Sequence, residues 1–190
     1  MRNTLPAIIV GLILAVFGCR DNQPEPATST PLVSSTTPTT QPTSFVNPSL
    51  GVSLTWSPEW MTKPSQDYVL MLVNSAGQSI SLDVPDLPMH LPGMIPIGLV
   101  KNGYLDDLRK HVGQLNIVEE SSPEIPHAKA RFVHTTWSNG GRNFVEMALL
   151  LVHADRVYII RADSNAEAYE SIRHAFDAVV RSLRWVNNAG

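Results

Sequence analysis

The sequence predicts an α+β fold, an antiparallel β-sheet meander packed by helices, preceded by a signal peptide and a disordered tether. Three observations predict it. Short alternating segments joined by hairpin turns indicate antiparallel strands, a closing segment has apolar residues at helical spacing, and the composition changes at Phe45. We therefore expect four segments: a signal peptide over 1–18, a tether over 19–44 that begins with Cys19, a globular domain over 45–186 and a disordered tail over 187–190.

The first strand of the domain is expected over Gly51–Trp56, where apolar and polar residues alternate with period two. Two more strands, Tyr68–Val73 and Gln78–Val84, flank Asn74–Gly77, which has the composition of a hairpin turn. The segment 85–96 contains four prolines. Because proline lacks a backbone donor, this segment is expected to be an irregular crossing.

A helix is expected over Ile97–Val112, with Gly113 as its C-terminal cap. Its apolar residues share one face: Leu105, Leu108 and Val112. A short strand over Leu115–Glu119 follows. Three strands in succession then form the meander: Ala128–Trp137, Asn143–His153 and Arg156–Ala162. The Asn-Gly pair between the first two of these strands is the strongest short hairpin signal.

The last element is a helix that we expect Ser164 to cap, with Glu167 three residues later completing a capping box. Its apolar residues fall on one stripe: Tyr169, Ile172, Phe176, Val179, Val180 and Leu183. The residues Leu183–Trp185 are expected to leave the helix as a short edge segment. Strands, helix, strands and helix joined by hairpins indicate an antiparallel α+β sandwich.

The N-terminus has the organisation of a signal peptide. A short positive region, Met1–Asn3, precedes the 13 apolar residues Leu5–Phe17. As a helix these rise roughly 20 Å, which is short of the ~30 Å hydrocarbon layer. Gly18 is the small residue expected at the cleavage site, and Cys19 follows it.

The residues Val16–Cys19 resemble the lipobox of bacterial lipoproteins. The resemblance implies that the chain is cleaved after Gly18 and that Cys19 carries membrane lipid, so that the protein is exported and anchored in the cell envelope. Arg20 favours the outer membrane under the enterobacterial sorting rule, but the inner membrane stays open. The alternatives are a plain secreted protein and an N-terminal membrane anchor with an incidental cysteine.

The domain resembles the Mog1/PsbP-like α/β/α sandwich domains. The resemblance covers about 45–185 and is carried by Phe45, the opening segments Gly51–Leu54 and Pro58–Trp60, the meander, and a closing helix with Tyr169, Phe176, Val180, Ser182 and Leu183. These are mostly core positions and none is catalytic. The resemblance implies a binding or assembly-supporting module.

Bulk properties exclude several classes of function. The 190-residue chain has a net charge of −3 and no run of basic residues, which argues against nucleic-acid binding. The single cysteine excludes an internal disulfide and an all-cysteine metal site. Residues 20–44 are rich in Ser, Thr and Pro, and as a random coil they would separate their ends by roughly 30 Å.

No catalytic, metal or cofactor site is expected from motifs. The six histidines lack metal-ligand spacing. His134 could meet Glu146 across the hairpin, but an ordinary cross-strand polar pair is the favoured interpretation. Asp83 and Asp86 could bind a cation, although such pairs more often cap turns.

The proline-rich segment 87–97 holds apolar side chains on an open backbone. We interpret Met89, Leu91, Met94 and Ile95 as a candidate partner surface. The favoured alternative is a flap that covers one edge of the core. The sequence thus predicts a membrane-tethered, non-enzymatic binding or assembly module with an envelope protein as candidate partner. A carrier of a small apolar ligand or lipid is the alternative, and a hydrolase is disfavoured.

Overall fold

The computed structural model describes residues 43–86 and 95–186. These described residues belong to one compact unit. Its larger sheet has seven strands, and every neighbouring pair is antiparallel. Across the sheet the order is β3 (Met61–Thr62), β4 (Leu70–Val73), β5 (Ser79–Asp83), β9 (Arg156–Asn165), β8 (Arg142–His153), β7 (Lys129–Asn139) and β6 (Leu115–Ser121).

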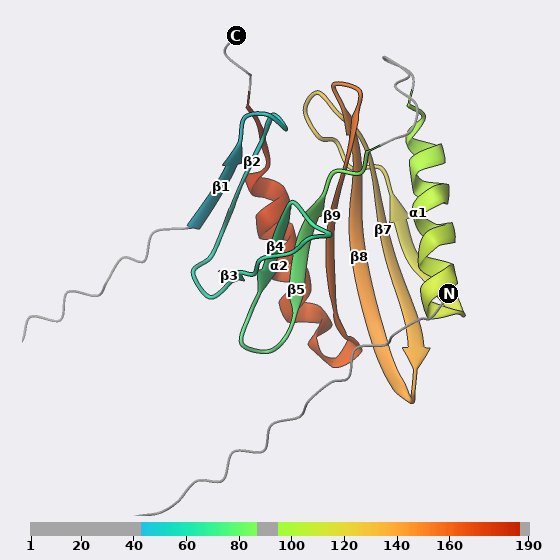
Figure 1. Ribbon diagram of the computed structural model, residues 1–190. Helices are drawn as coiled ribbons and strands as arrows, with labels where there is room; N and C mark the ends of the chain where they lie inside the picture. The colour runs from blue at the N-terminus through green and yellow to red at the C-terminus, as the bar shows by residue number, and fades with distance from the viewer. Residues whose placement is uncertain (1–42, 87–94, 187–190) are drawn as a thin grey trace, which may run out of the picture. The chain divides into compact units, whose positions relative to one another are not determined.

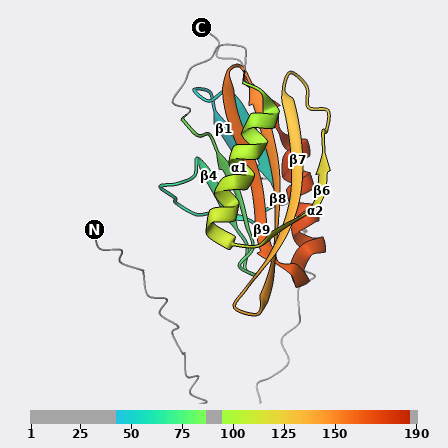
Figure 2. The same ribbon diagram turned by 90° about the vertical axis from the view of Figure 1, so that its right-hand side faces the viewer.

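A three-stranded sheet and two helices complete the domain (Figure 1). The small sheet has the order β1 (Thr43–Asn47), β2 (Val52–Trp56) and β10 (Arg184–Trp185). The helices are α1 (Ile97–Val112) and α2 (Tyr169–Ser182), and the 3₁₀ turn η1 (Ala166–Ala168) precedes α2. Helix α2 packs on β2 and β9, whereas α1 packs on β6, β7 and β8. The two helices therefore cover opposite faces of the large sheet, as Figure 2 shows.

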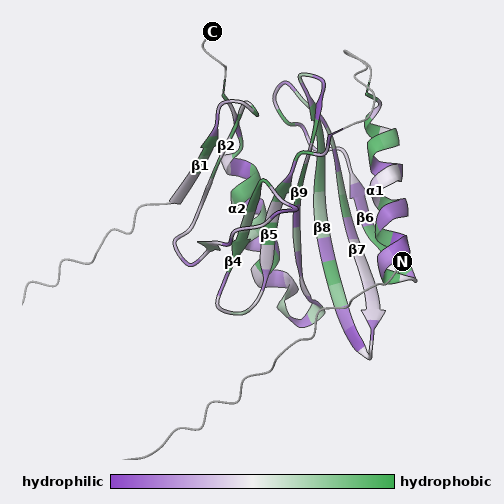
Figure 3. Cartoon of the chain, viewed as in Figure 1, coloured by the Kyte–Doolittle hydropathy of each residue, from purple (hydrophilic) through white to green (hydrophobic). Residues whose placement is uncertain are grey.

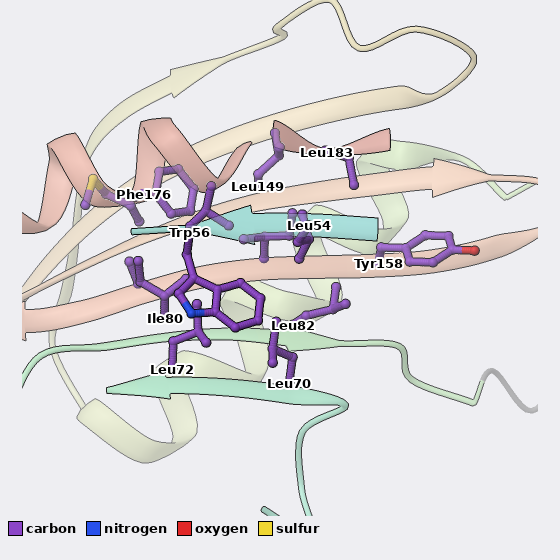
Figure 4. Packing of buried hydrophobic residues seen from close by; sticks show 14 of the residues in the cluster. Leu54, Trp56, Leu70, Leu72, Ile80, Leu82, Leu149, Tyr158, Phe176 and Leu183 are labelled. Atoms are coloured by element: carbon purple, nitrogen blue, oxygen red, sulfur yellow. The ribbon is translucent and has the colours of Figure 1, made fainter. Parts of the chain in front are cut away.

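The main core fills the space between the large sheet, α2 and the small sheet. Alternation along the strands directs Leu149, Ile160 and Ile80 into it. Figure 4 shows Trp56 of β2 and Phe176 of α2 among these side chains. Each of these five residues is less than 5% exposed. A smaller cluster under α1 contains Val133, Ala148 and Leu150.

The predicted fold class is confirmed, together with the meander, the bounds of α1 and the buried stripe of α2. The predicted N-cap is wrong: Asn165 accepts the backbone N–H of Ala168 at 3.0 Å, whereas Ser164 belongs to β9 and is 9% exposed. The strands β1 and β3 were not expected. The first begins at Thr43, inside the segment assigned to the tether.

Candidate functional site: polar rows and clefts of the large sheet

A row of polar side chains crosses the sheet face that α1 covers only in part. In register, Thr135 of β7 lies opposite Glu146 of β8, Glu146 opposite Asp163 of β9, and Asp163 opposite Ser79 of β5. Cross-strand partners share a face, so these four side chains lie on one line. The row begins beneath α1 and continues onto the part of the sheet beyond that helix.

Glu146 is the buried carboxyl of the row, with 6% of its surface exposed. The hydroxyl of Tyr104 on α1 donates a hydrogen bond to its Oε1. Burial raises the pKa of Glu146 to about 7, the hydrogen bond from Tyr104 opposes this rise, and the charge of Asp163 adds to it. Burial and the adjacent carboxyl likewise raise the pKa of Tyr104 well above its usual value. The carboxyl is therefore largely protonated below neutral pH.

Beyond α1, the row is held by hydrogen bonds between its own members. Ser79 Oγ donates to Asp163 Oδ1 at 2.6 Å. Two residues before Asp163 on β9, Arg161 Nε donates to Ser81 Oγ at 3.2 Å, and a second guanidinium N–H donates to the Tyr68 hydroxyl. The guanidinium carbon also lies 4.5 Å from the centre of the Tyr68 ring, a cation–π contact. The charged groups of this face are thus fixed in position in the free protein.

The predicted pair of His134 and Glu146 does not form. Register places Met147 opposite His134 and Thr135 opposite Glu146, so the two side chains point to opposite faces. His134 instead stacks on Tyr169, with ring centres 4.8 Å apart. Burial lowers the pKa of His134, an effect that the charge of Glu119 opposes. The correct register follows from the Gly140-Gly141 turn, whose two residues both have positive φ.

Two adjoining clefts lie at the end of the sheet where β7 turns into β8. The first has a volume of about 480 Å³ and the second about 510 Å³. Both are lined by Asn143, Phe144 and Ala166. The second also reaches Asp163, so it adjoins the polar row. Figure 3 shows hydrophilic residues at the tip of this hairpin. Nothing in the sequence reasoning pointed to these clefts.

The predicted site residues lie mostly outside the described residues: Gly18, Cys19, Met89, Leu91 and Met94. Ile95 is described, and it is 7% exposed. Its side chain is therefore part of the buried interior rather than of an exposed partner surface. Pattern alone could not distinguish these outcomes, because an apolar residue before proline is equally compatible with a buried and an exposed position.

Within residues 43–86 and 95–186, no three His, Cys, Asp or Glu side chains are grouped so that they could hold a metal ion. Asp83 and Asp86 belong to no such group. Burial raises the pKa of Asp83, and a backbone hydrogen bond opposes the rise. The described helices are too short or too polar to span a bilayer.

The sequence matches no profile of a known protein family and no curated protein. The fold is similar to that of cyanobacterial PsbP (CyanoP) from Synechocystis sp. PCC 6803, with a TM-score of 0.61 and 9% identity over 77% of this chain and 93% of that one. It is also similar to the Saccharomyces cerevisiae Ran-binding protein Mog1p, with a TM-score of 0.58 and 10% identity over 79% and 98% of the two chains. The third similar structure is LpqN of Mycobacterium tuberculosis, described as involved in cell envelope biogenesis, with a TM-score of 0.56 and 14% identity over 77% and 91%. The domain therefore has a Mog1/PsbP-like fold.

Proposed function

We propose that the protein is an exported lipoprotein, cleaved after Gly18 and held in a membrane by lipid on Cys19, whose domain is a non-enzymatic module that binds an envelope protein. The N-terminal part of the proposal depends on the lipobox-like sequence and on the position of the only cysteine after 13 apolar residues. One buried acyl chain binds a membrane only marginally, so the two or three chains of a lipoprotein are needed for stable attachment.

The observation that carries the binding role is the prearranged polar face beyond α1. Arg161 is positioned by Ser81 and Tyr68, and Asp163 by Ser79, before any partner arrives. Charged groups that are already ordered lose little side-chain entropy on binding and confer specificity through charge complementarity. The half-buried side chains of Met71 and Val73 lie on the same face and add apolar contact area.

The same geometry favours binding over hydrolysis. The hydrogen bond from Ser79 to Asp163 is a serine–carboxylate pair, but a nucleophile also needs a base such as histidine, oriented by a third group. None of the described histidines lies on the strands β5 and β9 that carry this pair. The similar structures include one named as a Ran-binding protein, and protein binding in that relative is consistent with this proposal.

Two experiments test the proposal separately. The full chain and a Cys19→Ser variant are expressed in a bacterial host with an alkyne fatty acid. We expect label and membrane association only for the unmodified chain, and equal labelling of both would contradict lipidation at Cys19.

A photo-crosslinking residue placed at Met71 reports on the polar face, and one at Lys110, on the exposed side of α1, is the control. We expect one discrete envelope protein to be captured from Met71 and not from Lys110. An Arg161→Gln variant that retains its circular dichroism spectrum should lose this capture. Equal capture from both positions, or capture that survives Arg161→Gln, would contradict a partner-binding role for this face.

A further inference from the structure

Helix α1 covers only one part of its face of the large sheet. It packs on β6, β7 and β8, and the described residues provide no second helix on that side, because α2 covers the opposite face. In Figure 2 α1 lies in front of the sheet and β4 lies to its left. We call the part of this face on β9, β5, β4 and β3 the open half of the sheet.

The open half has about the width of one helix. Neighbouring strands lie about 4.8 Å apart, so β9 and β4, with β5 between them, are separated by about 10 Å. A helix with its side chains is about 10–12 Å across. A second helix therefore fits on the open half, beside α1.

The backbone of the open half is already hydrogen-bonded within the sheet. The strand β4 pairs with β3 and β5, and β9 pairs with β5 and β8. A partner strand laid on this face would find no free N–H or C=O groups. A helix satisfies its own backbone and needs only side-chain contacts. The open half is therefore suited to a helix and not to an added strand.

Apolar side chains lie on the outer strands of the open half. Met61 of β3 is opposite Val73 of β4, and alternation along β4 places Met71 on the same face. Met61 is 61% exposed, and the other two side chains are half-buried. Methionine side chains adapt to irregular partner surfaces. These three residues can contact the apolar stripe of an amphipathic helix.

One row across the open half carries two cations. Register places Met71, Ser81 and Arg161 in this row. Lys63 extends it, because its backbone N–H donates to Met71 O at 2.8 Å and alternation from Met61 directs its side chain to the same face. An acidic group placed over this row would therefore lie between Arg161 and Lys63.

Each neighbouring row carries an acid. Asp163 follows Arg161 by two residues on β9, whereas Asp83 of β5 lies opposite Ile159, two residues before Arg161. Successive rows are about 7 Å apart along the strands. Helical residues four positions apart share a face and are separated by about 6 Å along the helix axis. A basic, an acidic and a basic residue at intervals of four on one helix therefore match the three rows.

From the width of the open half, its bonded backbone and its alternating charges, we propose that the partner binds through an amphipathic helix that lies beside α1. The apolar stripe of this helix contacts the methionines and the valine of β3 and β4. An acidic residue lies between Arg161 and Lys63, and a basic residue four positions to either side approaches Asp163 or Asp83. The proposal rests on the proposed function, because it names the chemistry of the partner at the same face.

Photo-crosslinking residues placed one at a time at Met61, Met71 and Val73 of the full chain test the proposal. Mass spectrometry then maps the crosslinked residues of the captured envelope protein. We expect these residues to be three or four positions apart, in a segment that carries Asp or Glu with Lys or Arg four positions to either side.

Mapped residues that alternate with period two or are scattered over several segments would overturn the proposed helix. A mapped segment without an acidic residue would overturn it too. Both results would leave the proposed function standing. Capture from none of the three positions would contradict the proposed function, and the helix with it.

Lys63→Glu and Lys110→Glu are matched charge reversals of exposed lysines, one on the open half and one on the exposed side of α1. The new carboxylate at position 63 would repel the acidic residue of the partner. We expect Lys63→Glu to lower the yield of capture from Met71 about 5-fold at low ionic strength and Lys110→Glu to leave it unchanged. Arg161→Lys, which keeps the charge, should retain more capture than Arg161→Gln. Equal yields from the two lysine variants would show that no acidic group of the partner approaches this row.

Discussion

Leu149 and Leu150 are neighbours on β8 and both are at most 1% exposed, yet they belong to opposite faces of the large sheet. Leu149 lies in the main core with β2 and α2, a large cluster of buried apolar side chains, and Gln78, His134 and Ser164 are the polar residues buried on the same side. Leu150 lies in the small cluster under α1, beside a face that also buries Thr135 and Glu146. One set of strands therefore supplies an apolar core on one side and a polar, partly buried surface on the other.

The difference between the faces separates stability from function. Apolar burial on the α2 side supplies most of the driving force for folding, and the burial of uncharged side chains does not depend on pH. The α1 side holds the titratable pair of Tyr104 and Glu146 together with the ordered charges of Arg161 and Asp163. Changes in the apolar core on the α2 side should thus cost stability at every pH, whereas changes at Tyr104 and Glu146 on the α1 side should have effects that depend on pH.

The largest effect is expected for Leu149→Ala on the apolar face. Removing a fully buried leucine side chain leaves a cavity and should lower the free energy of unfolding by about 2–5 kcal/mol. Leu99→Ala is the control, because Leu99 is 68% exposed and its loss should change stability by no more than about 0.5 kcal/mol. Urea unfolding monitored by circular dichroism measures both, and similar midpoints for the two variants would contradict the assignment of the core.

On the polar face, Glu146 should make stability depend on pH. Its pKa is about 7 in the folded protein and 4.5 is its usual value, so the folded state holds this proton more tightly than the unfolded state. The resulting stabilisation is fully present below pH 4.5 and is lost as the pH rises through 7. From these two pKa values the loss is on the order of 3 kcal/mol.

Glu146→Gln isolates this contribution, because the amide oxygen still accepts from Tyr104 but does not titrate. Asp83, whose pKa is also raised, contributes a change of the same sign to both proteins. We therefore expect the variant to gain stability relative to the unmodified protein between pH 4.5 and pH 8, measured by urea unfolding at each pH. Parallel curves over this range would show that Glu146 does not titrate as a buried acid.

Tyr104→Phe should have a smaller effect than either change. It removes the hydroxyl that donates to Glu146 but keeps the ring between α1 and the sheet. Leaving a buried carboxyl without its donor should cost about 1–3 kcal/mol. Hydrogen exchange should show the loss chiefly in α1. A uniform loss across α2 as well would indicate that the two faces are not energetically separate.

The smallest effect is expected at the ion pair between Lys101 of α1 and Glu120 of β6, whose N–O distance is 3.0 Å. Both side chains are partly exposed, so water and salt screen their attraction. Lys101→Met should cost at most about 1 kcal/mol, and less at high ionic strength. A large loss that persists in 1 M salt would show that this contact carries more of the docking of α1 than the Tyr104–Glu146 pair.

The elements that the sequence predicted well have strong local signals. The stripe of α2 and the Asn-Gly turn of the meander depend on neighbouring residues only, and α1 begins and ends where expected. The strand β1 has no such signal, because its residues continue the Ser- and Thr-rich composition of the tether. It becomes a strand by pairing with β2, and Phe45 is its main contact with the core. Tertiary pairing, not local preference, decides its structure.

The polar row and the clefts could not be predicted from the sequence, for a different reason. Glu146 and Asp163 are 17 positions apart in the sequence, and their proximity follows from the register of the β8–β9 hairpin. A shift of one residue moves every side chain to the other face, as the His134 pairing illustrates. The two-residue turn Gly140-Gly141, in which both residues have positive φ, sets the register of β7 against β8. Counting outward from this turn pairs His134 with Met147 and not with Glu146. The clefts need still more, because four separate stretches of the chain must meet to form them: Gly77, 114–116, 136–144 and 163–167.

The outer position of β1 has a mechanical consequence. A pull on the chain that precedes Thr43 is applied first to the pairing of Thr43 with Trp56, and then to successive pairs down to Asn47 with Val52. The strand β2 is meanwhile fastened to α2 by two hydrogen bonds between Thr55 and Ser182, of 2.8 and 2.9 Å. Under tension β1 should therefore peel away first and release about 17 Å of chain. The domain would thus extend under tension by detachment of β1, while the rest of the domain stays folded.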